Sequence, residues 1–165
     1  MSYVESLISR YKNKGIVVDT NLLLLYLIGS FDQEIIIKFK RTQVYTKEDF
    51  VTLSKFLKHF VIISNPNIIT EISNLSDTLN RQTEYRLFNF FKNALSSFNE
   101  SYCKTAEVST NQAFIKFGLT DSTIYDLADK GFLVLTDDFP LFGYLLNTGK
   151  TVINFNHIRT EYILN

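Results

Sequence analysis

The chain has 165 residues, of which 45% are hydrophobic and 21% charged; this suits one globular domain and excludes a disordered chain. Its 17 basic and 17 acidic residues give a formal net charge of zero, so any nucleic acid must bind to a local basic patch. A single cysteine excludes an intramolecular disulfide. The N-terminal segment lacks the pattern of a signal peptide, and the most apolar run, Leu22 to Ile28, is too short to span a bilayer. We therefore expect a cytoplasmic protein that does not enter a membrane.

Apolar periodicity and helix-capping residues predict an alternation of helices and strands. The expected elements, in chain order, are helix 4–11, strand 16–18, helix 20–28, helix 31–40, helix 47–58, strand 60–63, helix 66–79, helix 83–98, helix 107–117, helix 120–130, strand 132–136, helix 139–147, strand 151–155 and a short C-terminal helix. Thr46, Asn65 and Thr120 are the expected N-caps of three of the helices. Because short apolar strands alternate with helices, the sequence predicts an α/β fold with a parallel sheet covered on both faces.

Carboxylates follow two of the predicted strands. Asp19 comes directly after strand 16–18, and Asp137 and Asp138 come after strand 132–136. In parallel sheets, chemistry gathers at the carboxyl ends of the strands. Helix capping is the alternative role, for Asp19 at the helix that starts at Thr20 and for Asp138 at the helix that contains Pro140. Successive residues of an extended strand point to opposite sides, so we expect Asp137 to face solvent or a backbone amide when Asp138 faces the site.

Two further carboxylates lie at the margins of apolar helix faces. Glu71 flanks the stripe formed by Ile68 and Ile72, where it can either reach a cleft or remain solvated. Asp121 lies three residues before the apolar Ile124, in the first turn of its helix. There the helix dipole alone would also stabilise a negative charge.

Carboxylates brought together without counterions repel one another and raise each other's pKa. One or two Mg²⁺ or Mn²⁺ ions would relieve this conflict, because hard cations prefer oxygen ligands. Two histidines and one cysteine are too few for a typical zinc site. The acidic residues thus favour a magnesium or manganese centre that activates water for phosphoryl chemistry.

Four short motifs, in this order, resemble those of PIN-domain nucleases over nearly the whole chain. They are Val17-Val18-Asp19-Thr20-Asn21, Ile69-Thr70-Glu71-Ile72, Gly118-Leu119-Thr120-Asp121-Ser122 and Leu135-Thr136-Asp137-Asp138-Phe139. The resemblance implies a three-layer α/β/α sandwich in which residues 1–165 form one PIN-like domain and residues 4–11 form an N-terminal helical extension. It also implies a Mg²⁺- or Mn²⁺-dependent endoribonuclease.

The resemblance assigns roles to individual residues. It implies that Asp19, Glu71, Asp121 and Asp138 are catalytic and bind the metal, and that Asn21, Thr136 and Asp137 support them. Asp137 could also share the fourth ligand position. The implied partners are an RNA substrate, a second copy of the chain in a homodimer, and an antitoxin or other protein inhibitor if the chain is the toxin of a toxin–antitoxin pair.

Basic residues offer candidate phosphate contacts for such a substrate, with a solvated surface as the alternative. The candidates are Lys38, Lys40, Arg41, Lys55, Lys58, Arg81 and Arg86.

Three other classes of protein compete with the nuclease interpretation. A haloacid-dehalogenase-type phosphatase needs a second aspartate two residues after the first, where this chain has Asn21. A response-regulator receiver domain needs an extra acidic pair near the first strand and a lysine after a late strand, and neither is evident. A catalytically inactive PIN-type module that binds RNA or protein remains the alternative function.

Overall fold

The computed structural model describes residues 2–163, and side chains as far as Glu161. Its centre is a five-stranded sheet in the order β3-β2-β1-β4-β5, with every neighbouring pair parallel. The strands are β1 (Ile16–Val18), β2 (Ile62–Ser64), β3 (Asn99–Glu100), β4 (Leu133–Thr136) and β5 (Val152–Asn154). The central strand β1 pairs Ile16 with both Ile62 and Leu133. The prediction of a parallel sheet from short apolar strands is confirmed.

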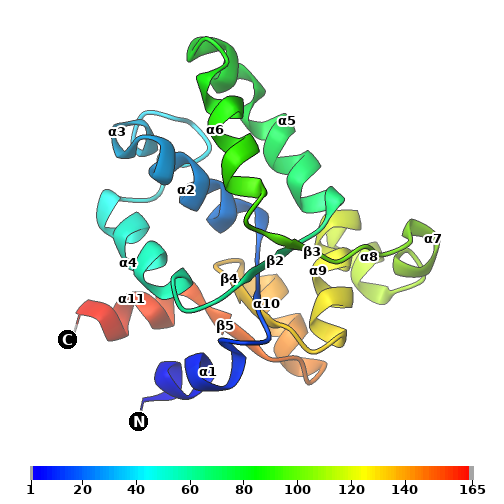
Figure 1. The fold of residues 1–165 in the computed structure, drawn as a ribbon. Helices are drawn as coiled ribbons and strands as arrows, with labels where there is room; N and C mark the ends of the chain where they lie inside the picture. Colours follow the sequence, from blue (N-terminus) through cyan, green and yellow to red (C-terminus); the bar gives the residue numbers. More distant parts are fainter. Residues whose placement is uncertain (1, 164–165) are drawn as a thin grey trace.

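Helices connect the strands and cover the sheet (Figure 1). They are α1 (Tyr3–Tyr11), α2 (Thr20–Phe31), α3 (Gln33–Ile36), α4 (Lys47–Leu57), α5 (Pro66–Gln82), α6 (Arg86–Leu95), α7 (Thr105–Val108), α8 (Gln112–Phe117), α9 (Leu119–Asp129), α10 (Phe139–Asn147) and α11 (Phe155–Ile163). From β1 the chain moves outward first through β2 and β3 and later through β4 and β5. Because parallel crossovers are right-handed, these two sets of connections place helices on opposite faces. In Figure 1, α4 lies beside α11 on one side of the strands, and α8 and α9 lie on the other.

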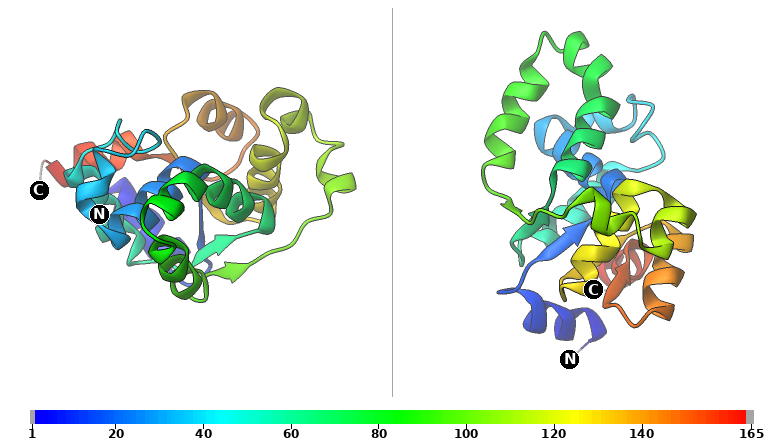
Figure 2. Two further views of the ribbon diagram at one scale, coloured as in Figure 1. Left: turned by 90° about the horizontal axis from the view of Figure 1, so that it is seen from above. Right: turned by 90° about the vertical axis from the view of Figure 1, so that its right-hand side faces the viewer.

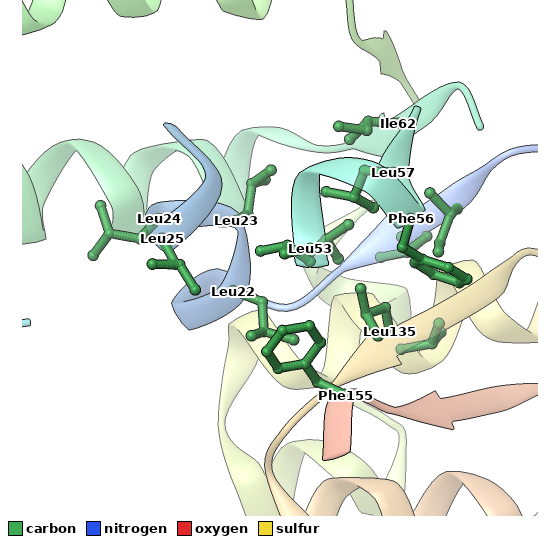
Figure 3. Packing of buried hydrophobic residues seen from close by; sticks show 14 of the residues in the cluster. Leu22, Leu23, Leu24, Leu25, Leu53, Phe56, Leu57, Ile62, Leu135 and Phe155 are labelled. Carbon is green, nitrogen blue, oxygen red and sulfur yellow. The ribbon is translucent and has the colours of Figure 1, made fainter. Parts of the chain in front are cut away.

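Helix α2 is the most deeply buried helix of the core. Leu22, Leu23, Leu24 and Leu25 are all fully buried, because α2 contacts α4, α5 and α6. Leu22, Leu135 and Phe155 belong to the same cluster of buried side chains (Figure 3), so that residues from distant parts of the chain meet at this helix. This burial explains why α2 is apolar on nearly every side, as predicted.

Two predicted helices differ from the observed ones at their starts. The helix expected over residues 31–40 is reduced to α3, because Asp32 adopts an extended conformation and caps a helix of only four residues. The helix expected from residue 83 begins three residues later, since Glu84 and Tyr85 take left-handed backbone angles. The resulting α5–α6 hairpin extends beyond the sheet (Figure 2, right).

Three features of the second half were also predicted wrongly. The helix expected over residues 107–117 is divided, because Asn111 caps a new helix that begins at Gln112, with its side chain accepting from the Ala113 amide. Gly118, not Thr120, occupies the N-cap of α9. Strand β3 was missed because it has only two residues, both polar and exposed. The other predicted elements are confirmed with shifts of at most three residues at their ends. The predicted N-cap at Thr46 is also confirmed, and there it forms a capping box with Asp49. Within residues 2–163, every helix falls short of the length and apolar content that crossing a bilayer requires.

Candidate functional site

Asp19 lies at the carboxyl end of the central strand and is the most buried carboxylate of the site, with 5% of its surface exposed. Its Oδ1 accepts a hydrogen bond of 2.9 Å from the Leu22 amide, so it is the N-cap of α2. Its Oδ2 accepts hydrogen bonds from the Thr136 hydroxyl and from the Asp137 amide, the latter at 3.1 Å. The capping role weighed for Asp19 is therefore confirmed, and the Thr136 hydroxyl is one of its hydrogen-bond donors. The side chain is held from three directions.

These hydrogen bonds do not offset the cost of ionising Asp19. Burial and, to a smaller extent, the neighbouring Asp137 carboxylate raise the pKa of Asp19 from 3.8 to about 7. The hydrogen bonds from Thr136, Leu22 and Asp137 act in the opposite direction but are outweighed. The structure thus holds a desolvated carboxylate at the end of β1 that would be stabilised by a nearby positive charge.

The two adjacent carboxylates after β4 point to different partners. Asp138 caps α10, with its Oδ1 accepting from the Leu141 amide at 2.8 Å, and its own amide donates to Thr136 Oγ1 at 3.0 Å. Asp137 instead accepts a hydrogen bond of 2.6 Å from the Tyr45 hydroxyl. The expectation that Asp137 faces solvent or a backbone amide is wrong in detail, because a buried tyrosine occupies that side. The expected divergence of the two carboxylates is observed.

Glu71 and Asp121 face each other across an open cleft of about 490 Å³ between α5 and α9. Glu71 Oε2 accepts a hydrogen bond of 3.3 Å from the hydroxyl of Thr20, the residue next to Asp19. Burial, followed by the charges of Asp138 and Glu71, raises the pKa of Asp121 from 3.8 to about 6. These effects place Glu71 and Asp138 within electrostatic reach of Asp121.

The carboxylates therefore form two neighbouring groups at one edge of the sheet. Asp19 and Asp137 form the first, while Glu71, Asp121 and Asp138 form the second. The Thr20–Glu71 hydrogen bond joins the groups through the start of α2. Among the described side chains, none of these five carboxylates forms an ion pair with a lysine, arginine or histidine. This edge consequently gathers acidic groups with which no cation of the described side chains forms an ion pair.

The donor set suits a hard cation, since it offers carboxylate oxygens and a threonine hydroxyl but no nitrogen or sulfur. A closed ligand set is nevertheless not formed: among the described side chains, no three histidine, cysteine, aspartate or glutamate residues are close enough to enclose a metal ion. Mg²⁺ commonly retains several waters and uses only one or two carboxylates. The arrangement therefore fits a partly hydrated divalent ion rather than an all-protein cage.

The remaining residues predicted for the site are divided between several places. Asn21 is exposed on α2 and makes no hydrogen bond to Asp19, whose oxygens are occupied by other donors. Arg81 pairs with Asp77 on the surface of α5, and the Arg86 Nε donates to the Thr83 carbonyl. The other basic candidates are exposed, with Lys55 and Lys58 at α4 and with Lys38, Lys40 and Arg41 in the turn after α3.

Sequence reasoning missed Thr20 and Tyr45. Thr20 directly follows Asp19, so its position alone could have drawn attention to it. Tyr45 is 92 residues away from Asp137, in a segment without motif or periodicity, and only the folded chain brings them together.

Comparison with known proteins adds no further assignment. No protein-family model matches the sequence, and no curated protein matches it significantly. An α/β fold with a five-stranded parallel sheet is established, and the function has to be inferred from the side chains at its carboxyl edge.

Proposed function

We propose that this protein is a PIN-like, Mg²⁺- or Mn²⁺-dependent nuclease that hydrolyses phosphodiester bonds of RNA. One observation supports the proposal above all others. Carboxylates from four separate parts of the fold (the ends of β1 and β4, α5 and α9) gather at one sheet edge without a cationic partner among the described residues. Such an arrangement costs free energy in the isolated protein, and a divalent cation offsets that cost.

The residues that would hold the ion are Asp19, Glu71, Asp121 and Asp138, one or two of them directly and the others through the waters that the ion retains. A bound Mg²⁺ or Mn²⁺ would activate water and stabilise the charge that develops on the phosphate. The ion would also favour the charged form of Asp19 and Asp121, and so lower their raised pKa values.

The protein itself supplies positioning and a proton acceptor. Asp19 is oriented before any ligand binds, because the Leu22 amide, Thr136 and the Asp137 amide hold both of its oxygens. Asp121 lines the cleft and has a pKa raised to about 6. With the ion bound, Asp121 would be ionised, so its carboxylate could orient an attacking water and accept its proton. Glu71 lines the same cleft, and the hydrogen bond that it accepts from the Thr20 hydroxyl limits its orientation.

Cleavage of RNA by variants tests this proposal directly. Purified protein is incubated with total RNA and with a labelled single-stranded oligonucleotide, in the presence of Mg²⁺, Mn²⁺ or EDTA. Asp19→Asn and Asp121→Asn should each reduce cleavage at least a hundredfold, which corresponds to about 2.7 kcal/mol of transition-state stabilisation. Asp129→Asn is the matched control, because Asp129 lies on α9 like Asp121 but pairs with Lys150 away from the cleft. Wild-type cleavage by both site variants would rule out this active site.

A non-catalytic PIN-type binding module is the second candidate, and it is favoured because the described side chains form no closed ligand set. The two functions differ in their response to metal. For the nuclease, Mn²⁺ should raise the melting temperature of the wild type but not that of Asp19→Asn, because ligand binding stabilises only the form that binds. RNA binding without any metal response and without cleavage would identify the binding module.

A further inference from the structure

A second hollow of about 640 Å³ runs along α5, next to the acidic cleft. One wall is the turn that follows α3, which carries Lys38, Lys40 and Arg41. The other wall is the face of α5 that presents Asn74, Thr78 and Gln82. In Figure 2 (right) this turn, drawn in cyan, lies beside the green α5 helix. We call this hollow the α3–α5 groove.

The charge of the α3–α5 groove is opposite to that of the cleft. Three basic side chains line it and no acidic residue does. Lys38, Lys40 and Arg41 are exposed, and none of them forms an ion pair within the described part of the chain. The nearby Glu34 pairs with Lys47 instead. In a chain whose net charge is zero, this is a local concentration of positive charge. It is offset only in part by Glu34, whose pKa is lowered mainly by its hydrogen bond with Lys47 and to a smaller extent by the charge of Lys38.

The basic turn is held in place and is not a loose surface loop. Thr42 is fully buried, and its hydroxyl donates to the Ile36 carbonyl at 2.8 Å. The amides of Thr42 and Gln43 both donate to the Phe39 carbonyl, at 2.9 and 2.8 Å. Phe39 packs against the core from the middle of the basic run. The three cations are therefore presented from a fixed backbone, which limits the entropy lost when they bind a ligand.

The groove and the acidic cleft are continuous along α5. Asn74 lines both of them. Glu71 in the cleft, Asn74 at the junction and Thr78 in the groove are spaced by three and four residues, so they form one stripe on the helix. From Glu71 to Gln82 the helix rises roughly 16 Å. A ligand that reaches from one hollow to the other must therefore be extended.

We propose that the α3–α5 groove binds the phosphate backbone of a single-stranded nucleic acid on one side of the bond to be cut. This inference rests on the proposed nuclease function, and it adds the substrate form and the position of the non-reacting nucleotides. The cations match phosphates, while Phe39 and the amides of Asn74 and Gln82 offer stacking and hydrogen bonds to exposed bases. A duplex would hide those base edges, so a single strand is the better match.

A charge-neutral triple variant, Lys38→Gln/Lys40→Gln/Arg41→Gln, tests the groove in the full-length protein. The control, Lys12→Gln/Lys14→Gln/Lys92→Gln, removes the same charge from exposed positions outside the groove. Binding of a labelled 12-nucleotide RNA is measured in EDTA as a function of salt. The slope of log K against log salt is negative, and it should be shallower by about two for the groove variant. Each of the three lost phosphate contacts to a single strand contributes about 0.7 to its magnitude. The control should retain the wild-type slope.

Cleavage assays then separate the groove from the reacting centre. The groove variant should cleave the 12-mer at least tenfold more slowly, yet hydrolyse bis(p-nitrophenyl) phosphate within twofold of the wild-type rate, because that small diester fills only the cleft. Lengthening the RNA on one side of the mapped cut should improve kcat/KM for the wild type and not for the groove variant, whereas lengthening on the other side should affect both equally.

The outcomes distinguish the two proposals. Unchanged RNA binding and cleavage in the groove variant, or an equal loss in the control, overturns the groove while the nuclease stands. Loss of binding in the groove variant, with no cleavage by the wild type in either metal, supports the groove as a nucleic-acid site and refutes the nuclease. If the wild type binds no single-stranded RNA or DNA, the groove proposal is wrong and an acidic protein partner takes its place.

Discussion

Replacing Asp19 by asparagine should make the metal-free protein more stable at alkaline pH. In the folded protein the pKa of Asp19 is raised from 3.8 to about 7. Below pH 4 the carboxyl is protonated in both the folded and the unfolded chain. Between pH 4 and 7 the unfolded chain releases this proton while the folded chain retains it, so stability falls as the pH rises. By pH 8 the loss amounts to about 4 kcal/mol, and asparagine, which does not titrate, avoids it.

Part of that gain is offset by a mismatched hydrogen bond. An asparagine oxygen can accept from the Leu22 amide and preserve the N-cap, because asparagine caps helices as well as aspartate does. Its amide group would face the Thr136 hydroxyl, which can rotate to accept, and the Asp137 amide, which cannot. Leaving the Asp137 N–H without an acceptor costs about 1–3 kcal/mol. At pH 8 the variant should therefore be more stable than the wild type by roughly 1–3 kcal/mol.

Urea denaturation in EDTA at pH 5 and pH 8 measures this difference. Between the two pH values the free energy of unfolding should fall by about 3 kcal/mol more for the wild type than for Asp19→Asn. The mismatched hydrogen bond of the variant does not affect this comparison, because it is present at both pH values. Asp129→Asn, a charge-matched variant at the exposed end of α9, should behave as the wild type does. Equal pH dependence in the wild type and Asp19→Asn would refute the description of Asp19 as a desolvated, uncompensated carboxylate.

Asp138→Ala should reduce RNA cleavage about a hundredfold more than Asp137→Ala, because the charge of Asp138 acts on Asp121 beside the cleft; the reverse ranking would assign the fourth ligand position to Asp137. Tyr45→Phe should lower the free energy of unfolding by about 1–3 kcal/mol, because the Asp137 carboxylate loses its hydroxyl donor; unchanged stability in urea would mean that water replaces the hydroxyl. Gly29→Ala should destabilise by about 1–3 kcal/mol, because the added methyl group would overlap the Phe50 ring between α2 and α4. A Gly29→Ala/Phe50→Leu double variant should recover part of that loss, and thermal melts that do not distinguish the single variant from the wild type would contradict this packing.

Much of the fold could be predicted from local sequence. Runs such as Ile16-Val17-Val18, which are apolar and β-branched throughout, favour buried strands, and N-caps such as Thr46 and Asn65 mark helix starts through short-range hydrogen bonds. The carboxylates at the strand ends were predictable for the same reason, since the chain places Asp19 and Asp138 directly after β1 and β4. Each of these signals lies within a few residues of the structure that it predicts.

Other features depended on contacts that no local pattern encodes. Strand β3 exists because Asn99 and Glu100 pair with β2, not because of their own composition. The hairpin start of α6 depends on the left-handed Glu84 and Tyr85, whose types do not favour that conformation.

The environment of the site was likewise set by tertiary structure. Sequence identified Asp19 as a candidate ligand but not its burial, and burial is the main cause of its raised pKa. The Tyr45 hydroxyl reaches Asp137 across 92 residues of chain, and the basic turn after α3 meets α5 only in the folded protein. Residue types alone determined the kinds of groups at this edge of the sheet. Their charge, partners and neighbours were determined by folding, because desolvation and long-range electrostatics depend on which distant segments pack together.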